Sequence, residues 1–301
     1  MSAPCAVIFA RLKRLIVSYF NEFGSVVWSY KGAAPKPRYP GAKGKDRMKD
    51  LTPTQKIRYS RNILVPEIGM TGQQKLLKGR VLVVGAGGLG SPALLYLACA
   101  GVGTIGIVDG DRVELSNLQR QILHTSEDLD ELKTHSAQDK LHRLNPDVCI
   151  EPYSEPFTAK NGHELVKKYD FVIEATDNFE AKFLVNDICI HAKVPFCHAG
   201  ILGMFGQVMT IVPGQGPCYR CVFGNIPEPG QVSSTDQVGV LGVVPGTLGT
   251  LQAAEAVKFL TGSGKLLLGR LLTFDALNLV FREIELPPPC CDVCRAAKLI
   301  Q

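Results

Sequence analysis

Long apolar runs are absent from this 301-residue sequence. The longest candidates, "VLVVGAGGLG" (81–90) and "VGVLGVVPGTLG" (238–249), are short and broken by glycine. A helix that crosses a bilayer needs about 20 apolar residues in succession. The composition, 46% hydrophobic and 20% charged, is instead typical of a chain that buries a large core. We therefore predict a soluble, cytoplasmic protein without a membrane partner.

The larger part of the sequence also lacks an excess of positive charge. The net charge of the whole chain is +5, but residues 1–47 contain nine Lys or Arg and two Asp or Glu, which gives this segment +7 and leaves −2 for residues 48–301. A nucleic-acid-binding domain needs a basic surface that offsets the phosphate charge. The charge balance therefore predicts no nucleic-acid partner.

Residues 1–47 differ in composition from the rest of the chain. "CAVIFARLKRLIVSYF" (5–20) mixes apolar and basic residues, and "KGAAPKPRYPGAKGKDR" (31–47) is typical of an unstructured tether. Three origins stay open: a targeting leader, a helix that lies on a membrane surface, and an upstream start codon, because Met48 opens a segment with the character of a natural beginning. We predict that the extension is disordered or a mis-assigned start, and that one domain spans residues 48–301.

Strand-like and helix-like segments alternate from residue 80 onward, without an internal repeat. Short runs of the kind that form buried parallel strands lie at 80–85, 104–111, 148–155 and 171–177. Helical spacing is found at 89–102, 132–146 and 179–194. This order predicts an α/β fold with a doubly wound, Rossmann-like, mostly parallel sheet. Strand patterns at 206–214, 271–276 and 279–286, with a helix at 247–262, predict an antiparallel C-terminal half.

The segment "GAGGLG" follows the first strand and opens the first helix. Gly85 permits a tight turn, Gly87 lets a phosphate approach the backbone, and Gly90 lets the helix pack close to the sheet. The N-terminus of the helix adds amide donors and the positive end of its dipole. We predict that nucleotide phosphates bind at Gly85, Gly87, Gly88 and Gly90. Asp109, nineteen residues after the loop, is placed to bond ribose hydroxyls.

Charged side chains gather after the second strand. "DGDRVELSNLQRQILH" contains Asp111, Asn117 and Arg120, and Lys133 follows soon after. The pyrophosphate of a dinucleotide is served by the helix N-terminus, whereas a triphosphate needs cationic side chains and a metal held by carboxylate. Arg120 and Lys133 supply such cations, and Asp177, at the carboxyl end of the fourth strand, offers a ligand for Mg²⁺. The sequence therefore favours ATP with Mg²⁺ over a nicotinamide or flavin cofactor.

Four cysteines form two CxxC pairs, Cys218 with Cys221 and Cys291 with Cys294, separated by 69 residues. Four thiolates in this spacing suit a tetrahedral Zn²⁺ site. A redox pair and a disulfide are the alternatives, and Cys290 is an alternative ligand. The six histidines show no metal-binding spacing. We predict one structural zinc bound by the two pairs.

Several motifs together resemble the ThiF/MoeB/HesA family, which comprises bacterial relatives of the ubiquitin-activating enzymes. The motifs are "RYSRNI", "GAGGLG", "VDGDRVELSNLQRQ", "ATDN", "PCYRC" and "CDVC", and the match runs from about residue 50 to 298. The resemblance implies that residues 48–301 form an ATP-binding adenylyltransferase domain. The implied reaction adenylylates the C-terminal Gly-Gly carboxylate of a small ubiquitin-like sulfur-carrier protein and releases pyrophosphate, for thiamin, molybdopterin or related biosynthesis.

The resemblance also assigns roles to the residues of the nucleotide site. Asp109 matches the ribose-binding acid, and Asp111 matches a second acid close to the reacting phosphate. Asn117, Arg120 and Lys133 match residues that hold and neutralise the phosphates. Because the attacking carboxylate is already ionised, the reaction needs cations and a metal but no general base. The sequence accordingly has no obvious Ser/His/Asp constellation.

Two further assignments concern the metal and the partner subunit. Asp177 matches the aspartate associated with magnesium, and Arg61 matches an arginine that family members supply to the ATP of the opposite subunit. The resemblance therefore implies a homodimer with Arg61, Arg120, Lys133 and Asp177 as catalytic residues. From the sequence alone, the favoured interpretation of Arg61 is a surface arginine that pairs with Glu67.

The segment before "GVLGVVPGTLG" departs from the family pattern. Some relatives carry there a cysteine that binds the carrier covalently, whereas this chain has Thr235 at about that place and no cysteine between Cys221 and Cys290. We therefore expect no thioester step at this loop. Residues 226–237 are either a lid over the carrier tail or a plain surface loop. The chain ends at Gln301 without a sulfurtransferase domain, so we expect a separate sulfur donor.

Three other functions stay open at this point. A tRNA-modifying dehydratase of the same family would carry a more basic surface than residues 48–301 provide. An NAD-dependent oxidoreductase would use the same glycine-rich loop. A non-catalytic partner-binding module would be expected to lack Arg120, Lys133 or Asp177, and all three are present.

Overall fold

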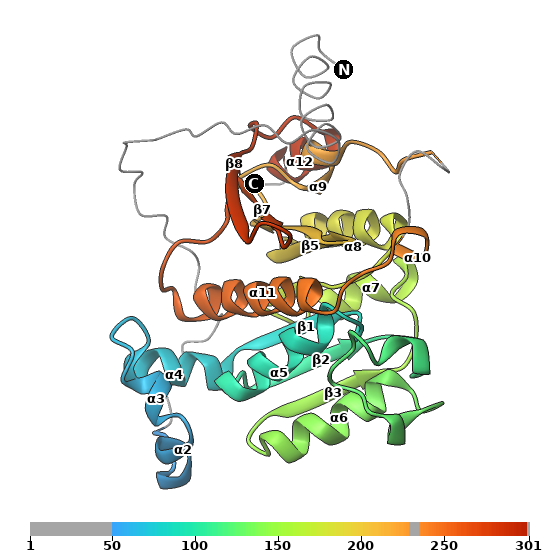
Figure 1. Cartoon of the computed structure of the whole chain (residues 1–301). Coiled ribbons are helices and arrows are strands. Elements are labelled where there is room, and N and C mark those ends of the chain that lie inside the picture. Colours follow the sequence, from blue (N-terminus) through green and yellow to red (C-terminus); the bar gives the residue numbers. More distant parts are fainter. Residues whose placement is uncertain (1–49, 229–234, 300–301) are drawn as a thin grey trace.

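An eight-stranded sheet runs through the middle of the molecule (Figure 1). The computed structural model describes residues 50–228 and 235–299. The strands stand in the order β3-β2-β1-β4-β5-β6-β7-β8. Their bounds are β1 Arg80–Val84, β2 Thr104–Val108, β3 Cys149–Tyr153, β4 Phe171–Glu174, β5 Phe196–Leu202, β6 Phe205–Ile211, β7 Arg270–Asp275 and β8 Val280–Glu285.

The sheet has a parallel part and an antiparallel part. Strands β1 to β5 pair in parallel, and β6, β7 and β8 continue the sheet in antiparallel pairs. This arrangement confirms the predicted doubly wound sheet with an antiparallel C-terminal half. The predicted extension, residues 1–47, lies outside the described residues.

Helices cover both faces of the sheet (Figure 1). One face carries α5 (Gly90–Ala100), α6 (Lys133–Leu144) and α11 (Val243–Thr261). The other carries α7 (Ala159–Val166) and α8 (Phe179–Ala192), with α9 (Tyr219–Phe223) and α12 (Asp292–Leu299) packed on α8. Alternate residues of a strand point to opposite faces, so Val81 and Val83 enter one core and Leu82 and Val84 enter a second core.

Several elements end earlier than the sequence pattern predicts. Strand β2 ends at Val108, and the side chain of the next residue, Asp109, accepts a hydrogen bond from the Ala86 N–H. Strand β4 ends at Glu174, whose carboxylate accepts a hydrogen bond from the Thr176 N–H and so turns the chain. Helix α7 was not evident from periodicity, and its signal is the Thr158 capping box.

Three short helices precede the sheet: α2 (Pro53–Arg58), α3 (Ser60–Ile63) and α4 (Gly69–Lys78). A capping box at Thr52 and the proline at the first helical position signal the first of them. Tyr59, between α2 and α3, is 1% exposed, and its hydroxyl accepts a hydrogen bond from Asn145 Nδ2 at 2.9 Å. A Cβ on Gly101, which caps the C-terminal end of α5, would lie 2.6 Å from the Tyr59 ring. The first helices therefore pack at that end of α5.

The strand order places a crevice at the edge where the parallel strands end. Strand β1 stands between β2 and β4, and the chain leaves these strands toward opposite faces of the sheet. Open α/β sheets bind ligands outside the carboxyl ends of the strands at such a point. Among the described helices, none combines the length and apolar character that a membrane span requires.

Candidate active site

The glycine-rich loop turns sharply at the end of β1. Gly85 has a φ of +101°, and a Cβ at this residue would lie 2.6 Å from the Ala175 carbonyl oxygen. Gly90 opens α5, and a Cβ there would lie 1.9 Å from the Gly85 carbonyl oxygen. Gly87 and Gly88 border the cleft at this edge of the sheet. The loop therefore has the geometry of a phosphate site, and its ligand stays a prediction.

Asp109 joins the end of β2 to this loop. Its Oδ2 accepts a hydrogen bond from the Ala86 N–H at 2.8 Å, and its Oδ1 accepts one from the Asp111 N–H at 2.9 Å. Burial raises the pKa of Asp109, while the charge of Lys133 and the two backbone hydrogen bonds oppose that shift. Each carboxylate oxygen has a second lone pair, so Asp109 can also accept hydrogen bonds from ribose hydroxyls.

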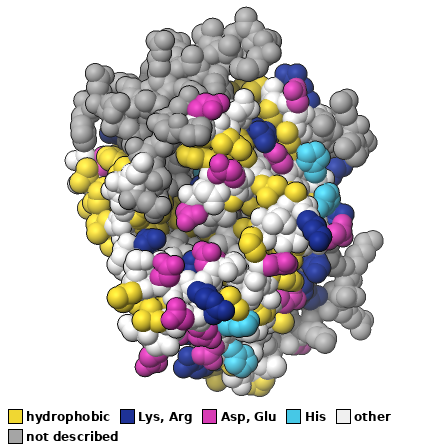
Figure 2. Space-filling model, turned by 90° about the vertical axis from the view of Figure 1, so that its right-hand side faces the viewer, with side chains coloured by type: hydrophobic (Ala, Val, Ile, Leu, Met, Phe, Trp, Pro, Cys, Tyr) yellow, Lys and Arg dark blue, Asp and Glu magenta, His cyan; other side chains and the backbone are white. Residues whose placement is uncertain are grey.

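A cleft of about 530 Å³ opens at the carboxyl ends of β1, β2 and β4, which is a usual size for a small-molecule site. The charged residues that line it are Arg120, Lys133, Lys182, Asp109, Asp111, Asp177 and Glu180. Figure 2 shows acidic and basic side chains intermixed on the face that lies to the right in Figure 1. Because the acids in the cleft outnumber the cations by one, a triphosphate needs further positive charge, which a divalent metal ion supplies.

Lys133 and Arg120 bring positive charge to the cleft from two elements. Lys133 opens α6, and its ammonium donates a hydrogen bond to Asp111 Oδ2 at 2.8 Å. The Lys133 side chain is 7% exposed, whereas that of Asp111 is 74% exposed. Arg120 Nη1 donates to the Ser116 carbonyl oxygen at 3.1 Å. Both cations have further N–H groups that donate to no described residue, and these groups can donate hydrogen bonds to phosphate oxygens.

Asp177 lies in the turn between β4 and α8 and is exposed at the edge of the cleft. Its Oδ1 accepts a hydrogen bond from Asn178 Nδ2 at 3.3 Å. Asn178 in turn caps α8, because its Oδ1 accepts a hydrogen bond from the Ala181 N–H at 2.8 Å. Carboxylate oxygens are ligands that Mg²⁺ prefers, so Asp177 fits a metal ion held over nucleotide phosphates.

Two predicted site residues are not among those that line the cleft. Asn117, in the 3-10 helix η1 (Leu115–Asn117), is 9% exposed, and its Nδ2 donates to Ser116 Oγ at 3.2 Å. Arg61 follows Tyr59, which packs at the C-terminal end of α5, whereas the glycine-rich loop lies at the N-terminal end. An 11-residue helix is about 16 Å long. The Arg61 side chain therefore does not reach the cleft of its own chain.

The four predicted cysteine ligands meet between α9 and α12, and their Sγ atoms all lie within 4.8 Å of one another. The Sγ–Sγ distances are 3.9 Å for Cys218–Cys221, 3.4 Å for Cys218–Cys291 and 3.7 Å for Cys221–Cys294. Four Zn–S bonds of about 2.3 Å in a tetrahedron place the sulfur atoms about 3.8 Å apart, whereas a disulfide joins them at about 2 Å. The geometry fits zinc. Cys290 stands outside the group and donates its backbone N–H to Cys221 Sγ at 3.3 Å.

Polar contacts with α8 hold the first cysteine pair in place. The Tyr219 N–H donates to Asn186 Oδ1 at 2.9 Å. Arg220 forms a two-pronged ion pair with Asp187, with both N–O distances at 2.7 Å. The Phe183 and Tyr219 rings meet edge to face with centroids 4.8 Å apart. The cluster is therefore built on the same helix whose N-terminus borders the cleft.

Sequence reasoning missed several residues that surround the nucleotide cleft. Pro156 and Phe157, which follow β3, line it, and so does Val240, which precedes α11. The rule that identifies Asp109 and Asp177 at strand ends would also have indicated the loop after β3, which contains Pro156 and Phe157. Glu174 and Lys182 carried no such signal, because an acid at the end of an apolar strand and a lysine on a helix become neighbours only in the fold.

The fold and the cleft define an α/β protein with cationic side chains beside a glycine-rich loop. The model of the ThiF family matches residues 59–296, which is more than half of the chain. The chain therefore belongs to the ThiF family, as its motifs predict.

Curated relatives agree with this family. The chain is 48% identical to the SAMP-activating enzyme E1 of Haloferax volcanii over 245 residues, 81% of this chain and 90% of that protein. It is 46% identical to the sulfur carrier protein adenylyltransferase of Thermus thermophilus over 243 residues, 79% of this chain and 90% of that protein. It is 45% identical to the adenylyltransferase and sulfurtransferase MOCS3 of Anopheles gambiae, but covers 55% of that protein. These relatives confirm the predicted class of enzyme, an adenylyltransferase.

Solved structures share the fold. Escherichia coli MccB bound to MccA-N7isoASN has a TM-score of 0.71 at 24% identity, covering 79% of this chain and 74% of MccB. PaaA has a TM-score of 0.64 at 25% identity, covering 81% of this chain and 77% of PaaA. The fold of this chain is thus found in other proteins of known structure.

Proposed function

We propose that this chain uses ATP to adenylylate the C-terminal Gly-Gly carboxylate of a small ubiquitin-like sulfur-carrier protein. The observation that carries the proposal is one cleft in which Arg120, Lys133 and Asp177 stand around the glycine-rich loop. The names of two relatives, a SAMP-activating enzyme E1 and a sulfur carrier protein adenylyltransferase, support the same substrate class.

The chemistry follows from the charges in the cleft. The carrier carboxylate attacks the α-phosphorus of ATP, a bond to AMP forms, and the bond to pyrophosphate breaks. Both reactants are anions, so Arg120 and Lys133 offset their repulsion by donating to phosphate oxygens. A bound Mg²⁺ adds further positive charge at the phosphates, and Asp177 would hold it. Asp109 orients the nucleotide through its ribose, and Asp111 keeps the Lys133 ammonium beside the cleft.

Carrier-dependent exchange of radiolabelled pyrophosphate into ATP tests this proposal. Each small Gly-Gly protein of the same genome is supplied in turn, and the matched control is the same carrier without its final glycine. We expect exchange with at least one intact carrier and none with the truncated form. Exchange that occurs without any carrier, driven by a small carboxylate, would instead support the dehydratase alternative. Absorbance changes of a reduced nicotinamide would support an oxidoreductase.

A homodimer belongs to the same proposal. Tyr59, two residues before Arg61, packs at the end of α5 opposite to the cleft, and within the described residues no ion pair joins Arg61 to Glu67. An exposed arginine in this position can serve the cleft of a partner subunit more readily than its own. We propose that Arg61 donates to the phosphates of the nucleotide bound by the opposite subunit.

The remaining parts of the proposal concern metals, sulfur and location. One zinc ion bound by Cys218, Cys221, Cys291 and Cys294 fits the distances between their sulfur atoms. Sulfur comes from a separate protein, and the enzyme acts in the cytoplasm. Residues 229–234 of the predicted lid lie outside the described residues, so the lid stays a prediction.

We also propose that the carrier leaves as an acyl-adenylate rather than as a thioester. Cys189 and Cys197 are fully buried, and burial raises the pKa of both thiols. A buried, protonated thiol is a poor nucleophile. Neither cysteine therefore replaces the one that some relatives carry near Thr235.

A further inference from the structure

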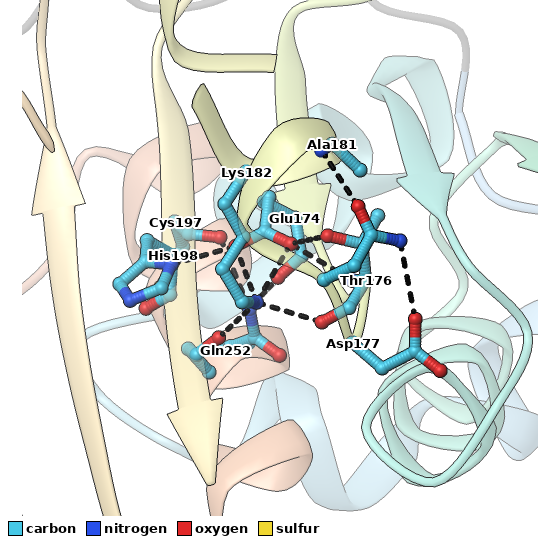
Figure 3. A network of polar contacts seen from close by, with 10 residues as sticks. Glu174, Thr176, Asp177, Ala181, Lys182, Cys197, His198 and Gln252 are labelled. Carbon is cyan, nitrogen blue, oxygen red and sulfur yellow. Dashed lines mark hydrogen bonds and ion pairs between the residues drawn. The ribbon is translucent and has the colours of Figure 1, made fainter. Parts of the chain in front are cut away.

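A buried ion pair lies directly behind the edge of the nucleotide cleft. Glu174 is the last residue of β4, and Lys182 lies in the second turn of α8 (Figure 3). The side chains are 1% and 8% exposed, and the Lys182 ammonium lies 3.1 Å from Oε1 and 3.2 Å from Oε2 of Glu174. Lys182 also lines the cleft. The pair thus separates the core from the place where a nucleotide would bind.

The ammonium of Lys182 has no donor left for a phosphate. It donates to the Thr176 carbonyl oxygen at 2.6 Å and to the Ala199 carbonyl oxygen at 2.9 Å, in addition to Glu174. An ammonium has three N–H groups, and these acceptors use all three. Lys133, by contrast, has one acceptor in the described part of the chain. Lys182 therefore differs in kind from the cation that faces the phosphates.

The carboxylate of Glu174 is equally engaged. Its Oε1 accepts hydrogen bonds from the N–H and the hydroxyl of Thr176, and its Oε2 accepts one from His198 Nδ1 at 2.6 Å. Burial raises the pKa of Glu174, but the charge of Lys182 and the hydrogen bonds from His198 and Thr176 outweigh burial and lower it. Gln252 Nε2 joins the Glu174 carbonyl oxygen, at 2.7 Å, to that of Cys197, at 3.0 Å. The end of β4 is thus fixed to β5 and α11.

Glu174 and Lys182 both contact the turn that carries Asp177. Thr176 is held through its N–H and its hydroxyl by Glu174 and through its carbonyl oxygen by Lys182. On the other side of Asp177, Asn178 is fixed as the cap of α8. Figure 3 shows the Asp177 carboxylate on the far side of Thr176 from the ion pair. The backbone on both sides of Asp177 is therefore fixed, while its carboxylate accepts one hydrogen bond from the described residues, that of Asn178.

We propose that Glu174 and Lys182 are positioning residues, which hold the Thr176–Asn178 turn so that the Asp177 carboxylate points to the place of a metal ion on the nucleotide phosphates. This inference rests on the proposed function. It assigns the pair a role in metal affinity that a purely structural ion pair does not have. Groups that orient a metal ligand typically change metal affinity by about 10-fold to 100-fold when removed.

The variants must remove the orienting contacts without leaving a lone buried charge. Lys182→Met alone would leave Glu174 uncompensated, which is strongly destabilising. The double variant Lys182→Met/Glu174→Gln removes both charges and nearly preserves both shapes. The control is the double variant Arg80→Met/Glu151→Gln. Arg80 and Glu151 also form an ion pair, with an N–O distance of 3.0 Å, but Arg80 lies at the end of β1 that is opposite to the cleft. Lys182→Arg is a second test variant that keeps the charge but not the geometry of the donors.

The experiment measures binding of Mn²⁺, as a paramagnetic substitute for Mg²⁺, to the full chain with a non-hydrolysable ATP analogue. Electron paramagnetic resonance gives the Mn²⁺ dissociation constant, and calorimetry gives the affinity for the analogue without metal. We expect the double variant to bind Mn²⁺ about 10-fold more weakly while its affinity for the metal-free analogue stays unchanged. The control pair should leave both values unchanged, and Lys182→Arg should weaken Mn²⁺ binding by a smaller factor.

A cycle with Asp177→Asn separates positioning from general damage. If the pair acts through Asp177, adding the double substitution to Asp177→Asn should not weaken Mn²⁺ binding further. Wild-type Mn²⁺ affinity in the folded double variant or in Lys182→Arg, or losses that add in the Asp177→Asn background, would overturn the inference. The metal-binding readout needs no carrier. A protein that binds Mn²⁺ and nucleotide as expected but exchanges pyrophosphate with no carrier would contradict the proposed substrate and leave this inference intact.

Discussion

The nucleotide cleft and the cysteine cluster differ in how far their polar groups are satisfied by the protein itself. In the cluster, four thiols face one another within 4.8 Å, so a bound ion would complete a closed tetrahedron. In the cleft, Lys133, Arg120 and Asp177 each keep donors or acceptors that no described residue uses. A closed set suits an ion that stays with the fold, and an open set suits ligands that enter and leave during turnover.

The largest expected effect comes from substitutions in the cleft. Asp177→Asn or Arg120→Ala should lower carrier-dependent pyrophosphate exchange by about 10²–10³-fold, because each removes a group that stabilises the transferring phosphate. The melting temperature should stay close to that of the wild type, since both side chains lie in an open cleft. Arg143→Ala is the control, because Arg143 is an exposed arginine paired with Asp139. Wild-type exchange in both folded variants would refute the assigned roles.

Changes in the cysteine cluster should lower the stability of the protein more than its catalytic activity. Cys218→Ser should reduce the zinc content below one per chain, because only three thiolates remain. Each kcal/mol lost lowers the melting temperature of a domain of this size by about 2–4 °C, and we expect a fall of about 10 °C. Cys290→Ser is the control and should keep its zinc, because the Cys290 thiol is not part of the four-thiol group and contacts Cys221 at its carbonyl oxygen. Metal analysis of anaerobically purified protein and calorimetry check both statements. Protein without zinc would refute the site.

Partial recovery of activity is expected when two inactive chains are mixed. Arg61→Ala and Asp177→Asn chains in one dimer give one cleft with both residues intact and one with neither, so about a quarter to half of the activity should return if each dimer has two independent sites. Each variant mixed with itself is the control. If subunit exchange is demonstrated and no activity returns, Arg61 does not act across the interface.

For the smallest expected effect, we predict that no covalent enzyme–carrier complex forms. Enzyme, carrier and Mg-ATP, separated without reducing agent, should show no enzyme–carrier band that disappears after thiol treatment. The reason is that no cysteine replaces Thr235 and that Cys189 and Cys197 are buried. The positive control is Thr235→Cys, which restores the thiol found in some relatives. A thiol-sensitive band in the wild type would show that the acyl-adenylate is not the released form.

The sequence was informative where one local pattern carries one structural demand. The run "RVLVVGAGGLG" predicted β1, the tight turn at Gly85 and the start of α5, because the glycines are required by backbone geometry at those positions. The CxxC pairs predicted a group of four thiols, because their spacing suits the ligands of a tetrahedral zinc ion. The zinc, the dimer and the nucleotide contacts stay predictions.

What the sequence did not reveal depends on contacts between distant segments. Glu174 ends an apolar strand and Lys182 lies eight residues later on a helix, and neither spacing indicates an ion pair. His198 and Gln252 join them from β5 and α11. Arg61 could not be placed relative to the cleft, because its position depends on how Tyr59 packs against the end of α5. Such long-range contacts become visible only in the folded chain.

Helix α8 connects the cleft to the cysteine cluster, so we expect the two regions to unfold locally together. Its 14 residues span about 21 Å. Its first turn borders the cleft through Asn178 and Glu180, and Asn186 and Asp187 hold the first cysteine pair. Proteins open in contiguous cooperative units rather than residue by residue. The amides at the two ends of α8 should therefore exchange with solvent deuterium at similar free energies, and a chain that loses its metal would expose the turn of Asp177 as well.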